Sequence, residues 1–478
     1  HAHLTVAPHH TGDQFLMART MNLARRRRSG ELTLIVMVAL ITGGGYVLAS
    51  LGTNSEIPTR IVPFLVAVVG LLVIAHIAVR LLARGADATI LPLAAFLHGI
   101  GYVMITRIDD RLAGLQTTWS FISVAAFIAT LVVVQRATDL ARYKWLLFTA
   151  GAGLLVLPMV PGIGTSFNTG AKIWVQIGPI NFQPGEFAKL ALAIFFASYL
   201  ADTKELIAAG TWKLGPIHLP SPRYIAPLLI AWGFSVLVMV GEKDLGSSLL
   251  FFTLFIVMLW VATQRVTYLI AGAVLFAGAA YIAWRIFGHV QQRVDIWLNP
   301  WADPLDDGYQ LVQALYGLSD GGILGTGLGV GSPNTVPLAQ TDFIFASIGE
   351  ELGLVGAATV LIGFMLLVGA GLRIAMRTEN SFEKLLAVGL TTIMGIQAFI
   401  IVGGVIKVIP LTGITLPFVS YGGSSLLANY VLLALLIRLS DSSARRLGEL
   451  PDDPLLGERW AAWRLRRTQR RTHRGVTA

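Results

Sequence analysis

Three aspartates gather in one short stretch of an otherwise apolar chain. The stretch reads NPWADPLDDGY, residues 299–309. Proline fixes the backbone φ angle at about −65°, so Pro300 and Pro304 restrict the chain on both sides of Asp303. This is how one carboxylate would be held in a defined place, so Asp303 is a candidate for chemistry. The other two acids, Asp306 and Asp307, precede a glycine and are typical of a solvated turn.

A second group of ionisable residues follows residue 170. Glu186 and Lys189 lie three positions apart near the start of an apolar run, so they share one helix face. Ionisable side chains in a membrane helix are costly and usually face a cavity or each other. Two interpretations stay open: Glu186 and Lys189 form the polar wall of a cavity, or they pair with each other in a purely structural role. Together with Lys172 and Lys243, Lys189 provides cations that suit a pyrophosphate.

Two tempting sites are not supported by the pattern. The glycine-rich segment 321–332 lacks both a preceding strand and the Lys-Ser/Thr of a phosphate-binding loop. The spacing of the aspartates does not match a calcium-binding EF-hand. The chain contains no cysteine, which excludes disulfides and thiolate-bound metals. The sequence alone therefore does not identify a metal site.

The rest of the chain must position these residues within a membrane. Of its 478 residues, 55% are hydrophobic and only 13% charged, whereas soluble domains carry about 25% charged residues. Repeated apolar runs of about 20 residues predict membrane-spanning helices. We expect an all-α polytopic protein with twelve spans, near 32–52, 60–83, 88–106, 117–136, 143–161, 184–201, 223–242, 245–262, 266–287, 349–373, 384–406 and 419–438.

Lysine and arginine are concentrated in every second loop, which sets the orientation. The positive-inside rule places these loops, and with them both termini, in the cytoplasm. Two long loops, 162–183 and 288–348, then face the exterior. The formal charge of +9 is explained by these anchors and does not predict nucleic-acid binding. The aspartates of 299–309 are thus expected at the outer membrane surface.

The chain divides into four predicted parts. Residues 1–31 form a cytoplasmic segment whose first 16 residues are polar, His-rich and typical of an appended extension. Two N-terminal helices occupy 32–87, the main membrane unit occupies 88–440, and a basic cytoplasmic tail occupies 441–478. In this tail, apolar residues recur at helical spacing among arginines: Leu455, Leu456, Trp460 and Trp463. A surface-lying amphipathic helix and a disordered tail fit this pattern equally well.

Six ordered segments resemble the SEDS family (shape, elongation, division and sporulation). They are GAKIWVQIGPINFQPGEFAKL, EKDLGSSLL, NPWADPLDDGYQLVQAL, GGILGTGLGVG, TDFIFASIGEELGLVG and IPLTGITLPFVSYGGSSLLANY. They fall in this order within about residues 88 to 440. The chain resembles the RodA-like branch more than the FtsW-like branch. The family has ten spans, so the first two helices are an N-terminal addition.

The resemblance implies a peptidoglycan glycosyltransferase of the bacterial cytoplasmic membrane that polymerises lipid II into glycan strands for elongation. It makes Asp303 the catalytic residue. Lys172, Glu186, Lys189, Lys243, Trp301 and Tyr309 become candidate substrate-binding residues. No tightly bound cofactor is expected, although Mg²⁺ or Mn²⁺ could assist the leaving pyrophosphate. The implied partners are lipid II, the growing strand, a class B penicillin-binding protein and other elongation-complex membrane proteins.

The sequence departs from the family pattern in a few places. Before Phe343 the family commonly has Pro-Glu-x-His-Thr-Asp, whereas residues 337–342 read PLAQTD. An essential role for that Glu and His is therefore doubtful here. Three other functions remain as alternatives: a lipid II flippase or solute transporter, a scaffold that recruits wall enzymes, and an FtsW-type division polymerase. No clear inverted repeat favours a transporter.

Overall fold

The computed structural model describes residues 10–57, 61–165, 171–178, 180–209, 212–214, 217–219 and 221–449. The first nine residues lie outside the described residues. So does the tail from residue 450, which includes the expected amphipathic stretch from Leu455 to Trp463.

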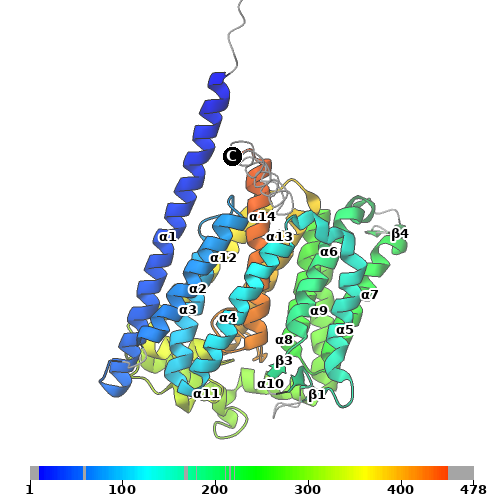
Figure 1. The fold of residues 1–478 in the computed structure, drawn as a ribbon. Helices are drawn as coiled ribbons and strands as arrows, with labels where there is room; N and C mark the ends of the chain where they lie inside the picture. Colours follow the sequence, from blue (N-terminus) through cyan, green and yellow to red (C-terminus); the bar gives the residue numbers. More distant parts are fainter. Residues whose placement is uncertain are drawn as a thin grey trace, which may run out of the picture.

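Long helices form a bundle that runs between two faces (Figure 1). Two short helices, α10 and α11, lie along one of these faces. The helices are α1 (His10–Asn54), α2 (Ile61–Leu82), α3 (Ile90–Ile108), α4 (Asp110–Val133), α5 (Lys144–Val156), α6 (Gly185–Ala208), α7 (Pro222–Gly241), α8 (Leu245–Thr263), α9 (Val266–Ile286), α10 (Gly288–Leu298), α11 (Tyr309–Gly321), α12 (Ile344–Arg377), α13 (Ser381–Val405) and α14 (Gly423–Arg446).

Strands are few and short, and they lie outside the helical bundle (Figure 1). Strands β1 (Gly164–Thr165), β2 (Trp174–Ile177) and β3 (Ile180–Phe182) form an antiparallel sheet in that order, and β4 (Trp212–Leu214) pairs with β5 (Ile217–Leu219). Four 3₁₀ turns complete the described elements: η1 (Ala137–Tyr143), η2 (Leu157–Met159), η3 (Pro300–Ala302) and η4 (Pro333–Thr335). The prediction of an all-α polytopic membrane protein is confirmed.

Within the described part of the chain, eleven helical segments are long and apolar enough to cross a membrane. The predicted sixth span is α6, which is not among the eleven. Its 24 residues extend about 36 Å, enough to cross. It carries Glu186 and Lys189 near one end and charged residues near the other, and its middle is buried by neighbouring helices. Burial in protein explains why α6 can be less apolar than a lipid-facing helix.

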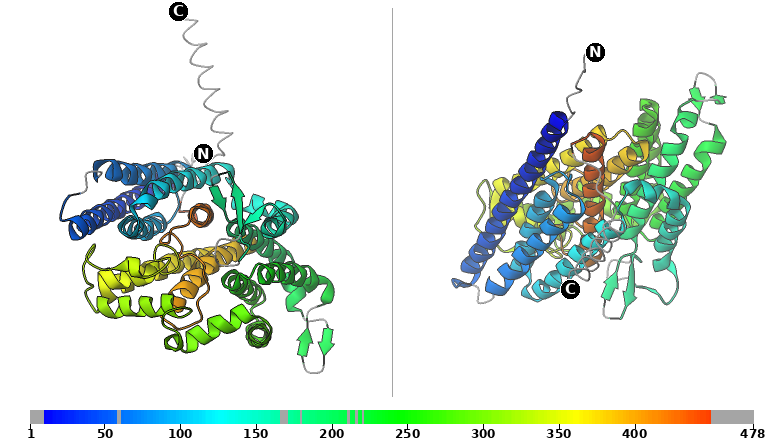
Figure 2. Two further views of the ribbon diagram at one scale, coloured as in Figure 1. Left: turned by 90° about the horizontal axis from the view of Figure 1, so that it is seen from below. Right: turned by 45° about the horizontal axis from the view of Figure 1, so that its top comes forward.

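The first helix begins and the last helix ends on the same side of the bundle. Helix α1 begins and α14 ends on the same face in Figure 1, while α10 and α11 lie at the opposite face. Figure 2 (left) views the face of α10 and α11 from below. An even number of crossings, as the sequence predicts, gives this arrangement.

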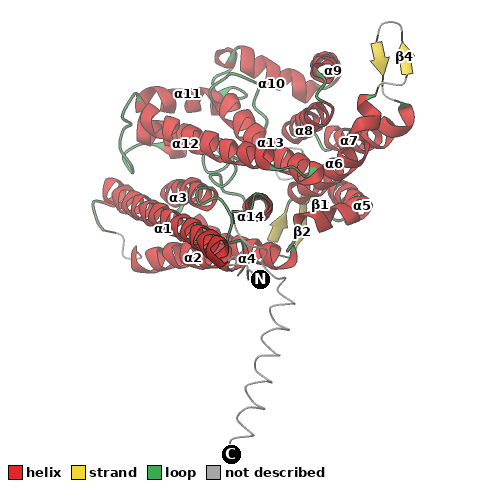
Figure 3. Ribbon diagram, turned by 90° about the horizontal axis from the view of Figure 1, so that it is seen from above, coloured by secondary structure: helices red, strands yellow, loops and turns green. Residues whose placement is uncertain are grey.

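The N-terminal helices α1 and α2 pack beside α3 and α4 (Figures 2 and 3). A buried ion cluster joins them: Nδ1 of His76 lies 2.7 Å from the Glu31 carboxylate, and Arg80 pairs with the same carboxylate. The Glu31 side chain is fully buried. A buried charge is tolerated only when it is paired, so this cluster fixes α1 against α2.

Helices α13 and α14 form the centre of the bundle, and α9 lies at its edge. In their most apolar windows, 78% of α13 and 83% of α14 is buried, against 6% of α9. The site described below lies where the central helices meet the loop 288–348, on the face of α10 and α11.

Candidate active site

Asp303 lies at the end of a tight, exposed turn. The 3₁₀ turn η3 starts at Pro300, and the Gly308 N–H donates to the Asp303 carbonyl oxygen at 2.9 Å. A Cβ atom at Gly308 would lie 2.2 Å from the Pro300 carbonyl oxygen, so this turn requires glycine. The Asp303 side chain is exposed. The structure therefore agrees with the sequence argument that the backbone around Asp303 is restricted.

An open cleft of about 630 Å³ runs between helix α10 and this turn. Three carboxylates line it: Asp295, Asp303 and Asp307. The side chain of Gln292 donates to the Asp307 carboxylate at 2.6 Å, so Asp307 has a structural partner as expected for a turn residue. The cleft can admit a polar substrate beside Asp303.

The opposite face of α10 docks on the loop between α13 and α14. The Arg293 guanidinium donates to the Leu411 carbonyl oxygen at 2.8 Å. One turn further along, the Trp297 indole donates to the Lys407 carbonyl oxygen at 3.2 Å. These contacts hold the helix from which the Asp303 turn extends.

Glu186 and Lys189 form a buried pair at the start of α6. The Lys189 ammonium lies 2.6 Å from the Glu186 carboxylate and donates to the Gln397 side-chain oxygen at 2.8 Å. Gln397 in turn donates to the Thr415 carbonyl oxygen at 2.9 Å. Lys189 is only 2% exposed and Glu186 is 8% exposed. The structure therefore brings together the two residues that their spacing predicted to share a face.

Further acids form a charged layer between this pair and α10. Asp244 caps the start of α8 by accepting the Ser247 N–H at 2.9 Å. Burial raises the pKa of Asp244, with Arg293 opposing the rise and Glu186 adding to it. Burial also raises the pKa of Asp342 to about 6, again against the effect of Arg293. Arg293 therefore interacts electrostatically with two carboxylates from different segments, Asp244 and Asp342.

Glu242 is a buried acid without a full set of partners. It is 5% exposed, and one of its carboxylate oxygens has no hydrogen-bond partner among the described residues. Burial raises its pKa to about 8, and the neighbouring Asp244 adds to the rise. The neighbouring Lys243, which the sequence analysis offered as a cation for a pyrophosphate, is exposed, whereas Glu242 and Asp244 on either side of it are buried.

The other predicted substrate-binding residues lie on the surface. Lys172 and Lys243 are exposed. Trp301 is 47% exposed and packs edge-on against Tyr316 at 5.5 Å between ring centroids. Tyr309 is partly buried at the start of α11. Among the described residues, no hydrogen bond or ion pair joins Asp303 to the Glu186–Lys189 pair, so their roles stay predictions.

The glycine-rich segment 321–332 is held in place through hydrogen bonds to its backbone. Arg107 at the end of α3 donates to the carbonyl oxygens of Gly329 and Gly331 at 3.2 and 2.9 Å, and pairs with Glu351 at 3.1 Å. Glu351 also accepts the Gly329 N–H at 3.0 Å. Gly52 of α1 packs directly on the Leu328 carbonyl oxygen. The glycines therefore permit close backbone contact, and no phosphate-binding loop is formed.

Sequence reasoning missed Gln397, Arg293 and Arg107. Gln397 is a lone polar residue within the apolar run TTIMGIQAFIIV, a pattern that marks a functional or buried partner in a membrane helix. Arg293 lies four residues before Trp297, so both were predictable as one helix face. Nothing in the sequence pairs Arg107 with the glycine-rich segment, because the two are more than 200 positions apart.

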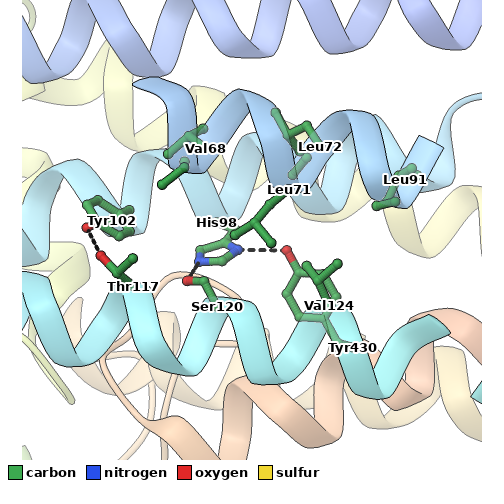
Figure 4. Close-up of a pocket in the computed structure, with 14 residues that line it drawn as sticks. Val68, Leu71, Leu72, Leu91, His98, Tyr102, Thr117, Ser120, Val124 and Tyr430 are labelled. Carbon is green, nitrogen blue, oxygen red and sulfur yellow. Dashed lines mark hydrogen bonds between the residues drawn. The ribbon is translucent and has the colours of Figure 1, made fainter. Parts of the chain in front are cut away.

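A second pocket lies between α2, α3, α4 and α14, and it is of a different kind (Figure 4). Apolar side chains such as Leu71, Leu72 and Val124 line most of it. His98 lies 2.7 Å from the Tyr430 hydroxyl and 3.0 Å from the Ser120 hydroxyl. This small buried network is satisfied internally. Its lining offers neither a carboxylate nor a lysine or arginine side chain for a pyrophosphate.

No ready metal site accompanies the aspartates. Over the described ranges, no group of three or more His, Asp or Glu side chains is placed to hold a metal ion. Asp295, Asp303 and Asp307 share a cleft but do not converge on one point. The residues present do not fit a resident divalent cation.

Comparison with known proteins identifies the family to which the chain is similar. A model of the cell cycle protein family matches residues 88–445. The peptidoglycan glycosyltransferase RodA of Mycobacterium tuberculosis is 44% identical over 435 residues, which cover 89% of this chain and 93% of that protein. The RodA of Mycobacterium leprae is 42% identical over 436 residues, with the same shares covered. A probable peptidoglycan glycosyltransferase FtsW from Geobacter sulfurreducens is 35% identical over 289 residues, or 60% of this chain and 74% of that protein.

Solved structures agree with this assignment. A structure described as showing how a peptidoglycan synthase complex coordinates polymerization and crosslinking aligns with a TM-score of 0.63 at 26% identity, covering 75% of this chain and 98% of that chain. The crystal structure of the Thermus thermophilus rod shape determining protein RodA aligns with a TM-score of 0.51 at 24% identity, covering 74% and 96%. The latter supports the fold alone.

Proposed function

We propose that this chain, which belongs to the cell cycle protein family of FtsW, RodA and SpoVE, polymerises lipid II into glycan strands at the outer face of the bacterial cytoplasmic membrane. It is a peptidoglycan glycosyltransferase and a multi-pass membrane protein. It is 44% identical to a RodA over 89% of the chain, and 32–35% identical to FtsW proteins over 60–75% of the chain. We therefore assign it to elongation and cell shape.

The observation that carries the mechanism is the position of Asp303 in an exposed, glycine- and proline-restrained turn beside an open cleft. In the proposed step, the Asp303 carboxylate takes the proton from the 4-hydroxyl of the acceptor sugar. The hydroxyl oxygen then bonds to the anomeric carbon of the donor, while the bond to the lipid pyrophosphate breaks. A single displacement of this kind inverts the anomeric centre.

The leaving pyrophosphate needs positive charge. Lys189 is the buried cation, and Glu186 orients it. The exposed Lys172 and Lys243 can meet phosphate groups at the membrane surface. Trp301 and Tyr309 provide apolar contact near Asp303. We propose that any Mg²⁺ or Mn²⁺ arrives with the substrate pyrophosphate rather than in a resident site.

We place both termini in the cytoplasm because the lysine- and arginine-rich loops alternate with the long loop 288–348. We also propose a crosslinking partner, a class B penicillin-binding protein. The support is the similar structure whose description joins polymerization to crosslinking in one complex.

The test is a polymerisation assay. Purified protein in detergent is given lipid II, and the products are separated by length. Glycan polymer that depends on this protein is the expected result. Transfer of lipid II across liposome membranes without any polymer would support the flippase alternative instead. Asp303→Asn protein serves as the matched control.

A further inference from the structure

We propose that Lys407 is a positioning residue for Asp303, an inference that rests on the proposed function. Lys407 lies in the turn after α13 and is 104 positions from Asp303. It contacts the end of α10, the helix that carries the Asp303 turn.

The backbone of Lys407 is in an unfavourable conformation. Its φ angle is +62°, in the left-handed region, where a residue with a Cβ atom is strained and glycine is not. The turn is closed by the Val408 N–H, which donates to the Gly403 carbonyl oxygen at 2.7 Å. Glycine would fit this turn at lower cost. Such strain persists where other interactions hold it, and it is found often at functional sites.

Two contacts hold the strained lysine against the last turn of α10. Its carbonyl oxygen accepts the Trp297 indole N–H at 3.2 Å, and its ammonium group donates to the Leu298 carbonyl oxygen at 3.3 Å. Leu298 is the final residue of α10. The carbonyl groups at a helix C-terminus lack intrahelical partners and favour a cation. The Lys407 ammonium therefore satisfies a carbonyl group at the end of α10, while the Lys407 carbonyl oxygen holds the Trp297 side chain.

The position of Asp303 depends on that helix end. Only Asn299 and the three residues of η3 separate Leu298 from Asp303. The Asp303 side chain is exposed, so packing does not orient it. The bonds from Arg293 to Leu411 and from Trp297 to the Lys407 backbone also hold α10, and neither depends on the Lys407 side chain. Loss of the Lys407 ammonium should therefore loosen the Asp303 turn without undocking the helix.

The experiment uses three full-length variants. Lys407→Gly removes the ammonium and relieves the strained backbone. Lys407→Arg keeps a cation at the same place. Gln264→Gly is the matched control, because Gln264 also has a left-handed backbone, φ +58°, but caps α8 away from this loop. All three are compared with the parent for melting temperature, kcat and KM with lipid II.

The expected result separates stability from activity. Lys407→Gly should melt no lower than Gln264→Gly, yet its kcat should fall by about tenfold or more, since a displacement of about 1 Å can cost up to about 100-fold. Its KM should change little. Lys407→Arg should recover most of the kcat. A Lys407→Gly protein with the parent's kcat would overturn the inference. So would a loss of kcat that Lys407→Arg fails to recover.

A second readout does not depend on activity. The chain has no cysteine, so Leu305→Cys, at a residue that is 87% exposed, gives a single site for a spin label beside Asp303. Lys407→Gly should raise the label's mobility, whereas Gln264→Gly should not. Unchanged mobility in Lys407→Gly rejects the positioning role. Absence of polymer from the parent rejects the proposed function instead, and the mobility result still decides the structural claim.

Discussion

At the scale of single residues, the proposed chemistry depends on one exposed carboxylate. Asp303 cannot rely on burial for its orientation, so the tight turn over Gly308 must provide it. We expect Asp303→Asn to reduce polymerisation by about 100-fold to 10,000-fold, because loss of a general base has this effect. The folded protein should persist, since the side chain is exposed. Product length on a gel measures the loss, and an unchanged melting temperature controls for folding. Near-normal polymer from this variant would remove Asp303 from the mechanism.

The Glu186–Lys189 pair permits a sharper test. Removing either charge leaves the other buried, which commonly costs ~3–5 kcal/mol. Glu186→Gln and Lys189→Met should each lower the melting temperature and the activity. The double variant should recover the folding, because no unpaired charge remains. If Lys189 meets the pyrophosphate, polymerisation stays low in the double variant. If both properties recover, the pair is structural only.

Glu242 gives a pH dependence with a defined sign. Its pKa in the folded protein is raised to about 8, from 4.5 for the ordinary carboxyl group. The folded state therefore holds this proton more tightly than the unfolded state does. Stability from this group is present below pH 4.5 and is lost as the pH rises toward 8 and beyond. The melting temperature should fall between pH 6 and pH 9.

Glu242→Gln cannot titrate, so most of that fall should disappear in this variant. The exposed Glu379→Gln should keep it and is the control. A parallel pH profile in Glu242→Gln and the parent would show that Glu242 is not responsible.

At the scale of elements, helix α1 supports the loop 288–348 through a glycine contact. A Cβ atom at Gly52 would lie 2.1 Å from the Leu328 carbonyl oxygen, whereas a Cβ at Gly44 in the same helix meets nothing within 4 Å. Gly44→Ala should stabilise the protein by about 0.5–1 kcal/mol, since alanine favours a helix over glycine. Gly52→Ala should lower the melting temperature, because backbone must shift. Equal changes in the two variants would mean that α1 does not support this loop.

Apolar runs of about 20 residues were enough to predict the membrane-length helices, and helical spacing was enough to predict that Glu186 and Lys189 share one face. Glu186 and Lys189 are three residues apart, so local geometry brings them together. The docking of Arg293 on Leu411 and of Arg107 on the glycine-rich segment was not predictable. Each joins residues more than 100 positions apart, and local pattern carries no information about which distant carbonyl group an arginine will reach. Helix α10 was also missed, because its 11 residues contain no apolar run of membrane length.

At the scale of the whole molecule, the direction in which the bundle crosses the membrane decides whether the proposed reaction can occur. Lipid-linked donors and growing strands must reach Asp303 from outside, so the loop 288–348 must be extracytoplasmic. The structure places α10 and α11 on the face opposite to the end of α14 (Figure 1). The charge pattern then orients the whole bundle.

Ser332 lies in this loop and is exposed. Because the parent has no cysteine, Ser332→Cys creates a single reactive thiol. We expect a membrane-impermeant thiol reagent to label it in intact cells. A cysteine at Glu379, in the exposed loop between α12 and α13, should react only after lysis, because that loop lies on the other face of the bundle. The opposite pattern would place Asp303 in the cytoplasm and rule out the proposed polymerisation at the outer surface.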